Sequence, residues 1–108
     1  MGTCYWWMVR IIARKHLDAF ARQHPSTFVA LGAWRTRVKL AEWRSMSDVQ
    51  EAYPKAKTLN GERARFEIQG GDFRLIAAFD FARQLVFIKF IGTHAQYDRI
   101  DALTIARF

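Results

Sequence analysis

The chain has 108 residues, of which 51% are hydrophobic and 25% are charged. This composition is typical of an ordinary globular protein with one modest core. Lys and Arg outnumber Asp and Glu by 17 to 10, a net charge of +7, which indicates either a polyanionic partner or a basic surface that is merely solvated. The only cysteine, Cys4, excludes an internal disulfide and a cysteine-based zinc site.

The N-terminal residues predict neither a signal peptide nor a membrane anchor. MGTCYWWMVRII lacks a basic start, and no apolar run approaches the roughly 18–20 residues that span a bilayer. We therefore expect a cytoplasmic protein. An ordinary first strand begins at Met8, whereas residues 1–7 fit no pattern and are either an upstream start or an extension. Residues 1–108 are expected to form one domain.

The first half of the chain predicts a strand and three helices. The strand is expected at Met8–Ala13. The helical spacing of Leu17, Phe20 and Ala21 predicts a helix that ends before Pro25. A longer helix capped by Ser26 follows, with Leu31, Trp34, Val38 and Ala41 on one face. Ser47 and Gln50 have capping-box spacing, which predicts a short helix that runs to Tyr53.

In the second half the apolar residues change to the period of strands. Arg63–Ile68 alternates strictly, Gly70-Gly71 indicates a hairpin, and strands are expected at Asp72–Phe79 and Leu85–Ile91. The expected fold is an α+β domain: an antiparallel sheet with helices packed on one face and an open, basic opposite face.

The two faces of this sheet follow from the pairing of its strands. If two-residue loops lie at Gly70-Gly71 and Ala82-Arg83, directly opposed residues share a face. One face is free of charge and is expected to carry the helices: Ala64, Phe66, Ile68, Phe73, Leu75, Ala77, Phe79, Val86, Ile88 and Phe90. The other collects the charged residues: Arg63, Arg65, Glu67, Arg74, Ile76, Ala78, Leu85, Phe87, Lys89 and Ile91.

The four cations of the open face suit a nucleic-acid backbone. Other interpretations remain open, because Arg74 has Glu67 as a cross-strand partner, and Arg63 and Arg65 are typical of a charged edge strand. Lys89 is harder to explain by structure alone, since a lone lysine in an apolar strand usually has a partner or a task.

His94 and Tyr97 follow directly on the most strand-like segment, LVFIKFI. His16 and His24 are interpreted as structural, but His94 lies near the basic face. Asp98 either orients His94 or caps a following turn, and we favour the cap. The histidines and acidic residues do not have metal-ligand spacing, so no metal or other cofactor is expected.

These side chains fit RNA transesterification without a metal. The 2′-hydroxyl attacks the adjacent phosphorus, a base removes the 2′ proton, an acid protonates the leaving 5′ oxygen, and cations stabilise the transition state. Histidine is the side chain most often used for either proton-transfer role, and His94 suits both.

The chain resembles the HigB-type toxins of bacterial toxin–antitoxin modules, within the RelE superfamily. The resemblance runs from about Val9 to Asp101 in three segments: IIARKHLDAFARQHP, KLAEWRSMSDVQEAYP and RFEIQGGDFRLIAAFDFARQLVFIKFIGTHAQYDRID. FRLI and FIGTHAQYD are its most specific elements. It implies a RelE-like fold, an endonuclease that cleaves mRNA on the ribosome and so inhibits translation, and a helix-turn-helix, HigA-like antitoxin as partner.

The resemblance also implies the site. Arg74 in FRLI, with His94 and Tyr97 in GTHAQYD, are implied active-site residues, and Lys89 follows less directly. Lys57, Arg63 and Arg65 are expected to bind the RNA backbone. The chain departs from the family at Glu67, where Asn is common, and in the Gly70-Gly71 turn. A non-catalytic RNA- or ribosome-binding module, or an inactive homologue that only docks an antitoxin, therefore remains an alternative.

Overall fold

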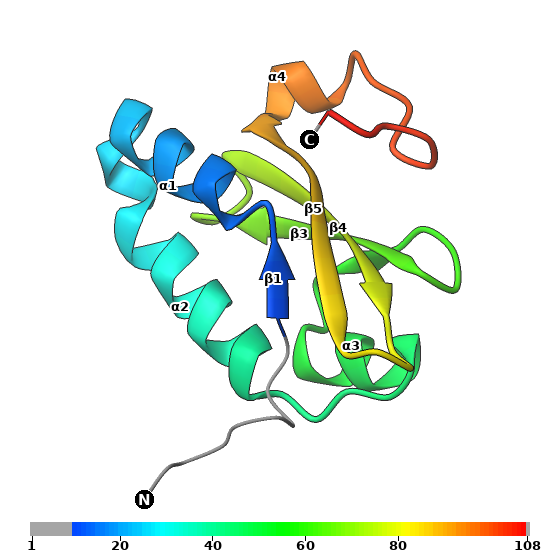
Figure 1. Cartoon of the computed structure of the whole chain (residues 1–108). Helices are drawn as coiled ribbons and strands as arrows, with labels where there is room; N and C mark the ends of the chain where they lie inside the picture. The colour runs from blue at the N-terminus through cyan, green and yellow to red at the C-terminus, as the bar shows by residue number, and fades with distance from the viewer. Residues whose placement is uncertain (1–9, 108) are drawn as a thin grey trace, which may run out of the picture.

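The computed structural model describes residues 10–107. A strand, three helices and a run of four further strands follow one another, and a last helical turn comes after them (Figure 1). The strands are β1 (Arg10–Ile12), β2 (Lys57–Thr58), β3 (Arg63–Ile68), β4 (Phe73–Asp80) and β5 (Leu85–Thr93). The α-helices are α1 (Arg14–Gln23), α2 (Phe28–Leu40), α3 (Met46–Ala52) and α4 (His94–Tyr97), with a 3₁₀ turn at Pro25–Thr27. The predicted α+β class is confirmed.

The described strands form one sheet in the order β1-β5-β4-β3-β2. Its pairs are antiparallel from β2 to β5, as predicted for β3, β4 and β5, whereas β1 lies parallel to β5. The parallel pair needs a long crossover, which residues 13–84 supply. The short edge strand β2 was not predicted. The first two residues of the predicted first strand, Met8 and Val9, lie outside the described residues.

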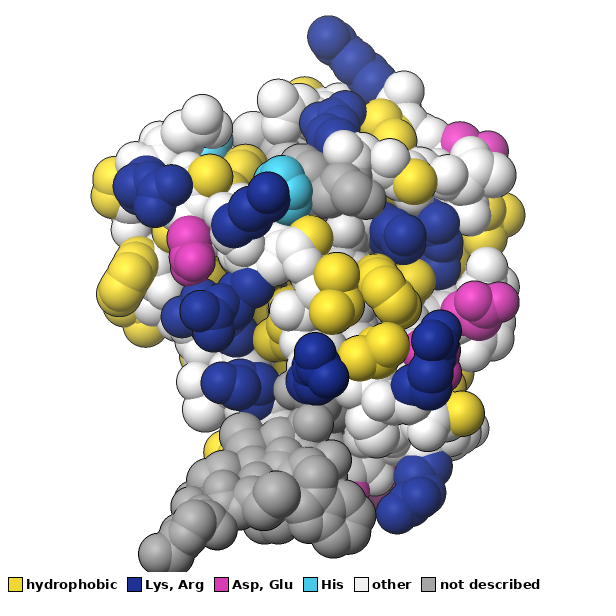
Figure 2. Space-filling view, in the orientation of Figure 1, with side chains coloured by type: hydrophobic (Ala, Val, Ile, Leu, Met, Phe, Trp, Pro, Cys, Tyr) yellow, Lys and Arg dark blue, Asp and Glu magenta, His cyan; other side chains and the backbone are white. Residues whose placement is uncertain are grey.

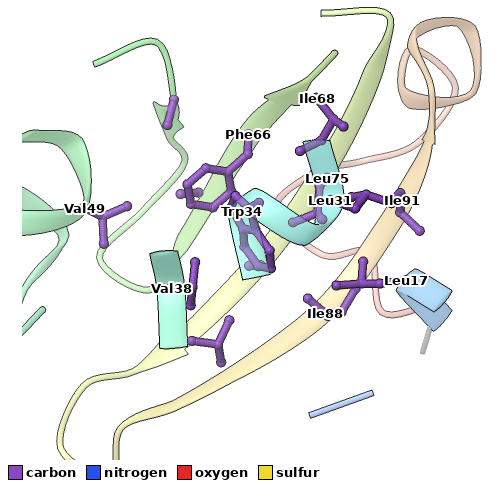
Figure 3. Close-up of a cluster of buried hydrophobic side chains, with 14 of the residues drawn as sticks. Leu17, Leu31, Trp34, Val38, Val49, Phe66, Ile68, Leu75, Ile88 and Ile91 are labelled. Atoms are coloured by element: carbon purple, nitrogen blue, oxygen red, sulfur yellow. The ribbon is translucent and has the colours of Figure 1, made fainter. Parts of the chain in front are cut away.

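The core lies between the charge-free face of the sheet and helices α1 and α2 (Figure 3). Leu31, Trp34 and Val38 point from α2 to the sheet, as their helical spacing predicts. They meet Phe66 on β3 and Leu75 on β4, which are almost fully buried. Each such large side chain stabilises the fold by about 1.5–3 kcal/mol.

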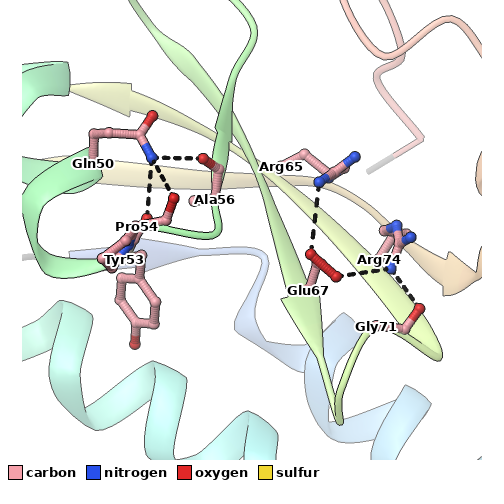
Figure 4. Close-up of polar contacts among 8 residues, drawn as sticks. All are labelled: Gln50, Tyr53, Pro54, Ala56, Arg65, Glu67, Gly71 and Arg74. Atoms are coloured by element: carbon pink, nitrogen blue, oxygen red, sulfur yellow. Dashed lines mark hydrogen bonds and ion pairs between the residues drawn. The ribbon is translucent and has the colours of Figure 1, made fainter.

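Two predicted helix caps are wrong. Ser26 donates a hydrogen bond to Gln69 instead of capping α2, whose N-cap position is Thr27. Gln50 does not close a capping box with Ser47. Its side-chain amide donates to the backbone carbonyls of Tyr53, Pro54 and Ala56 and so satisfies the chain after α3 (Figure 4).

The predicted register is confirmed for β3 and β4 and only partly for β4 and β5. Every β3–β4 pair is as expected, from Arg63↔Ala78 to Ile68↔Phe73. The β4–β5 pairs are as expected from Asp80↔Leu85 to Ala77↔Ile88, but beyond a bulge Ile76 pairs with Phe90 and Leu75 with Ile91. Lys89 is the extra residue. Phe90 and Ile91 therefore exchange faces relative to the prediction, and Ile91 joins the core.

The bulge places Ile91 in the core, where it is only 5% exposed. Truncating this side chain should therefore destabilise the fold. We expect Ile91→Ala to lower the free energy of unfolding by about 2–5 kcal/mol, because it leaves a cavity in the core. Urea unfolding followed by circular dichroism measures it. Leu103→Ala, at a side chain 51% exposed, is the matched control. Equal stability of the two variants would contradict the assigned register.

Candidate active site

Two arginines on neighbouring strands share one carboxylate. Glu67 on β3 lies opposite Arg74 on β4, and Arg65 is two residues before it on the same face. Glu67 oxygens lie 3.7 Å from Arg74 Nη1 and 3.9 Å from Arg65 Nη2 (Figure 4). Arg74 also donates to the carbonyl of Gly71. The Arg65 and Arg74 side chains are 18% and 11% exposed, so the cluster holds two cations in fixed, partly desolvated positions.

The turn before β4 permits this arrangement. Gln69, Gly70 and Gly71 all have positive φ, at 55°, 68° and 98°. A Cβ on Gly71 would lie 2.8 Å from Glu67 Oε1 and 3.2 Å from Arg74 Nη1. The second glycine of the turn therefore serves both the backbone conformation and the close approach of the ion pair.

The segment after β5 carries His94 and Tyr97 to the same end of the sheet. Thr93 and Gln96 form a capping box around α4, and the His94 backbone N–H donates to the carbonyl of Asp72. The spacing T-x-x-Q is visible in the sequence, and it is the signal that could have located this turn. The capping box and the His94–Asp72 hydrogen bond hold the start of α4 against the hairpin of β3 and β4.

His94 is exposed and pairs with Asp98. Its Nδ1 lies 3.1 Å from Asp98 Oδ2. Of the two interpretations of Asp98, the structure therefore supports the one that orients His94, and the cap that we favoured is wrong. With Nδ1 engaged by the carboxylate, Nε2 is left for proton transfer.

Tyr97 links the arginine cluster to Phe90. The Arg65 guanidinium lies 5.8 Å from the centre of the Tyr97 ring, and the Phe90 and Tyr97 rings are 6.4 Å apart. Gly92, opposite Arg74, makes room for the Phe90 ring and the Gln96 side chain. A Cβ there would lie 2.7 Å from Phe90 Cζ and 2.6 Å from Gln96 Oε1. Sequence reasoning placed Phe90 in the core and missed this contact.

Lys89 and Arg63 lie in a separate hollow of about 530 Å³, lined also by Phe87 and Asp80. Lys89 Nζ sits 5.3 Å from the centre of the Phe87 ring. Asp80 accepts a 2.7 Å hydrogen bond from Arg83, and this bond lowers the pKa of its carboxyl group. The predicted residues thus divide into one group with Arg74, Tyr97 and Arg65 and another with Lys89 and Arg63.

The basic face is not fully open, which corrects the prediction. Arg63 donates to the carbonyls of Ala102 and Ile105, at 3.2 and 2.7 Å, and the Arg107 N–H donates to the Lys89 carbonyl at 3.0 Å. The C-terminal segment, residues 98–107, therefore crosses this face, on the other side of the sheet from α1 and α2 (Figure 1). The short-range pattern of the sequence contained no signal for these long-range contacts.

The remaining predicted residue, Lys57, is exposed on β2, where it pairs with Arg65 and shares its face. Cations far outnumber acidic side chains on the side of the molecule in Figure 2.

On the other side of β3, a second hollow of about 460 Å³ is lined by Tyr53 and Arg37. Burial raises the pKa of Tyr53, whose ring lies 4.7 Å from the Arg37 guanidinium.

The site combines the cations Arg65 and Arg74 with the exposed imidazole of His94, which Asp98 orients. Cations of this kind can bind a phosphodiester, and an imidazole can transfer a proton. Within residues 10–107, no cluster of three or more His, Cys, Asp or Glu side chains is arranged to hold a metal ion. None of the helices in this range is both long enough and apolar enough to cross a membrane.

Comparison with known proteins adds a family. Residues 28–100 match the model of the HigB toxins, described as the RelE-like toxic component of a toxin–antitoxin system. A curated relative is the mRNA interferase HigB of Escherichia coli O6:H1 (strain CFT073). It is 23% identical over 94 residues, which cover 85% of this chain and 91% of the relative.

The shared carboxylate predicts how charge removal affects anion binding. We expect Glu67→Gln to tighten binding of a short single-stranded RNA at low salt by about twofold to fivefold, because Arg65 and Arg74 lose an internal competitor. Fluorescence anisotropy measures the affinity. Glu51→Gln, at an exposed position on α3, makes the same charge change elsewhere. An equal gain in both variants would mean that only net charge matters.

Proposed function

The chain belongs to the HigB family of RelE-like toxins, and from this premise we propose that it is a ribosome-dependent mRNA endonuclease that inhibits translation. The name of its curated relative, an mRNA interferase, supports endoribonuclease activity. The observation that carries the proposal is the placement of Arg65, Arg74 and Tyr97 in one cluster, at the end of the sheet where His94 is exposed.

The proposed reaction is attack of the 2′-hydroxyl on the adjacent phosphorus. Arg74 binds the scissile phosphate and stabilises the charge that develops in the transition state. His94 transfers a proton, with Asp98 holding its Nδ1. Tyr97, half-buried against Arg65, orients the attacking hydroxyl. This mechanism needs no metal ion.

The other cations extend the site along the RNA. Lys89, in the separate hollow beside Phe87, binds a phosphate of the same strand next to the one that Arg74 holds. Lys57 and Arg65, which lie side by side on β2 and β3, bind the backbone of the strand. Arg63 contributes to the same surface, although its guanidinium is already engaged by the C-terminal segment.

The proposed partners follow from the family and the target. A toxin of a toxin–antitoxin system has an antitoxin, which we propose to be a helix-turn-helix protein of the HigA type. The substrate is mRNA engaged on the ribosome, which places the action of the protein in the cytoplasm.

The site assignment predicts loss of toxicity. We expect His94→Ala and Arg74→Ala each to relieve growth arrest on induced expression and to reduce cleavage by about 100-fold or more, because each removes a proton-transfer or charge-stabilising group. Colony counts after induction measure the first effect. Circular dichroism must show folded proteins. Arg83→Ala, whose side chain is 72% exposed, should stay toxic. Full toxicity of both site variants would refute the assignment.

The activity itself is tested by mapping mRNA 5′ ends after a short pulse of expression. We expect new ends in phase with codons, and none in naked mRNA incubated with purified protein without ribosomes. The reason is that the ribosome presents the substrate in one reading frame. Stalled translation without new ends would favour a non-catalytic ribosome-binding module instead.

A further inference from the structure

The C-terminal segment brings an additional cation to the basic face. The Arg107 backbone is tied to the carbonyl of Lys89, and its guanidinium lies 4.8 Å from the centre of the Phe90 ring. Phe90 is fully buried, whereas Arg107 is exposed. The guanidinium thus lies against an aromatic ring while the residue remains accessible from solvent.

Arg107 extends a row of neighbouring aromatic rings and guanidinium groups. From Phe90 the row continues to the Tyr97 ring, tilted by 56° at 6.4 Å, and from there to the Arg65 guanidinium at 5.8 Å. Aromatic rings and guanidinium planes are surfaces on which nucleobases stack, since every base has a π face and single-stranded RNA exposes it.

We propose that Arg107 forms a stacking subsite for an unpaired nucleobase of the RNA, and that Arg63 is a positioning residue that holds the C-terminal segment in place. The proposal rests on the function proposed above and names a substrate contact beyond the scissile phosphate. The base stacks on the side of the guanidinium away from Phe90. The fixed plane limits the entropy that ordering a long side chain would otherwise cost.

The charges of the segment favour a binding surface over a plug. A segment that blocks a cationic face is expected to offer carboxylates to it. Here Asp98 pairs with His94, and Asp101 accepts a hydrogen bond from the Leu103 N–H in its own turn. The contacts to the face are made by backbone carbonyls and by Arg107. The segment carries two arginines and two aspartates, and Arg107 is the charged side chain that it brings to the face, where the substrate is anionic.

Binding of a fluorescently labelled single-stranded RNA oligonucleotide tests the stacking subsite. We expect Arg107→Ala to weaken affinity about tenfold, within the range for one stacked base. Arg107→Lys should not restore affinity, because lysine keeps the charge and loses the plane. Arg99→Ala, an exposed arginine of the same segment, should change affinity by less than about threefold. An abasic oligonucleotide should not distinguish Arg107→Lys from the unaltered protein.

The positioning role of Arg63 is tested by a double-mutant cycle. We expect Arg63→Ala to reproduce most of the loss of Arg107→Ala, because alanine has no donor for the carbonyls of Ala102 and Ile105, both of which accept from Arg63 Nη1. The double variant should bind no more weakly than the worse single variant. Additive losses would refute the positioning role and assign Arg63 a direct contact with RNA.

Two other outcomes would overturn the stacking subsite without contradicting the proposed endonuclease function. Tighter binding by Arg107→Ala would make the segment a blocking strap. Normal binding by Arg107→Lys would reduce Arg107 to a point charge. Either result leaves codon-phased cleavage by the unaltered protein intact. Conversely, a protein that shows this Arg107 dependence and does not cut mRNA would retain the subsite and lose the endonuclease function.

Discussion

The extra residue in β5 is the constraint on which the arrangement of the basic face depends. Lys89 interrupts the alternation of β5 between Ile88 and Phe90. Because side chains alternate along a strand, one inserted residue sends everything after it to the opposite face. Phe90 is thereby placed on the basic face, Ile91 enters the core, and the Lys89 carbonyl accepts the Arg107 N–H.

Two glycines, Gly92 and Gly71, leave the space that the side chains of the site occupy. Gly92 lies opposite Arg74, and its missing side chain leaves the space that Phe90 and Gln96 occupy. Gly71 does the same for Glu67 and Arg74 across the hairpin. In both places small size, rather than only backbone freedom, is the requirement. Bulky neighbours and charged groups can then approach closely without displacing the strands.

The sequence predicted the helices and strands that follow from a regular spacing of apolar residues. It predicted few features that depend on contacts between distant segments. Strict alternation in Arg63–Ile68 located β3 and its register with β4 residue by residue. The bulge was invisible, because Phe90 and Ile91 are both large and apolar and either face accepts them. The parallel pairing of β1 with β5 and the path of residues 98–107 depend on contacts between distant segments.

The candidate site was predicted to a similar extent. The strand pattern brought Arg74 and Tyr97 to the same end of the sheet, through the hairpin and the short step from β5 to α4. It did not separate Lys89 from Arg74, whereas in the structure Lys89 lies in the hollow beside Phe87. Capping signals were ambiguous in the same way. Ser47 and Thr93 both have the spacing of a capping box, but only the Thr93 box forms. Gln50, the expected partner of Ser47, is occupied by three carbonyls.

The arginine–carboxylate pairs of the site are longer than two other arginine–carboxylate pairs within residues 10–107. Arg35 and Asp18 approach to 2.8 Å, and Arg83 and Asp80 to 2.7 Å, which are hydrogen-bond distances. The Glu67 oxygens lie 3.7 and 3.9 Å from two guanidinium groups, beyond that range. One carboxylate also leaves the pair of arginines with a net positive charge. Glu67 therefore moderates the field of Arg65 and Arg74 without satisfying their donors, and the buried Nε–H groups of both arginines have no hydrogen-bond partner among residues 10–107. A phosphate accepts bidentate hydrogen bonds from a guanidinium group. It can therefore satisfy more of the donors of these arginines than the glutamate does.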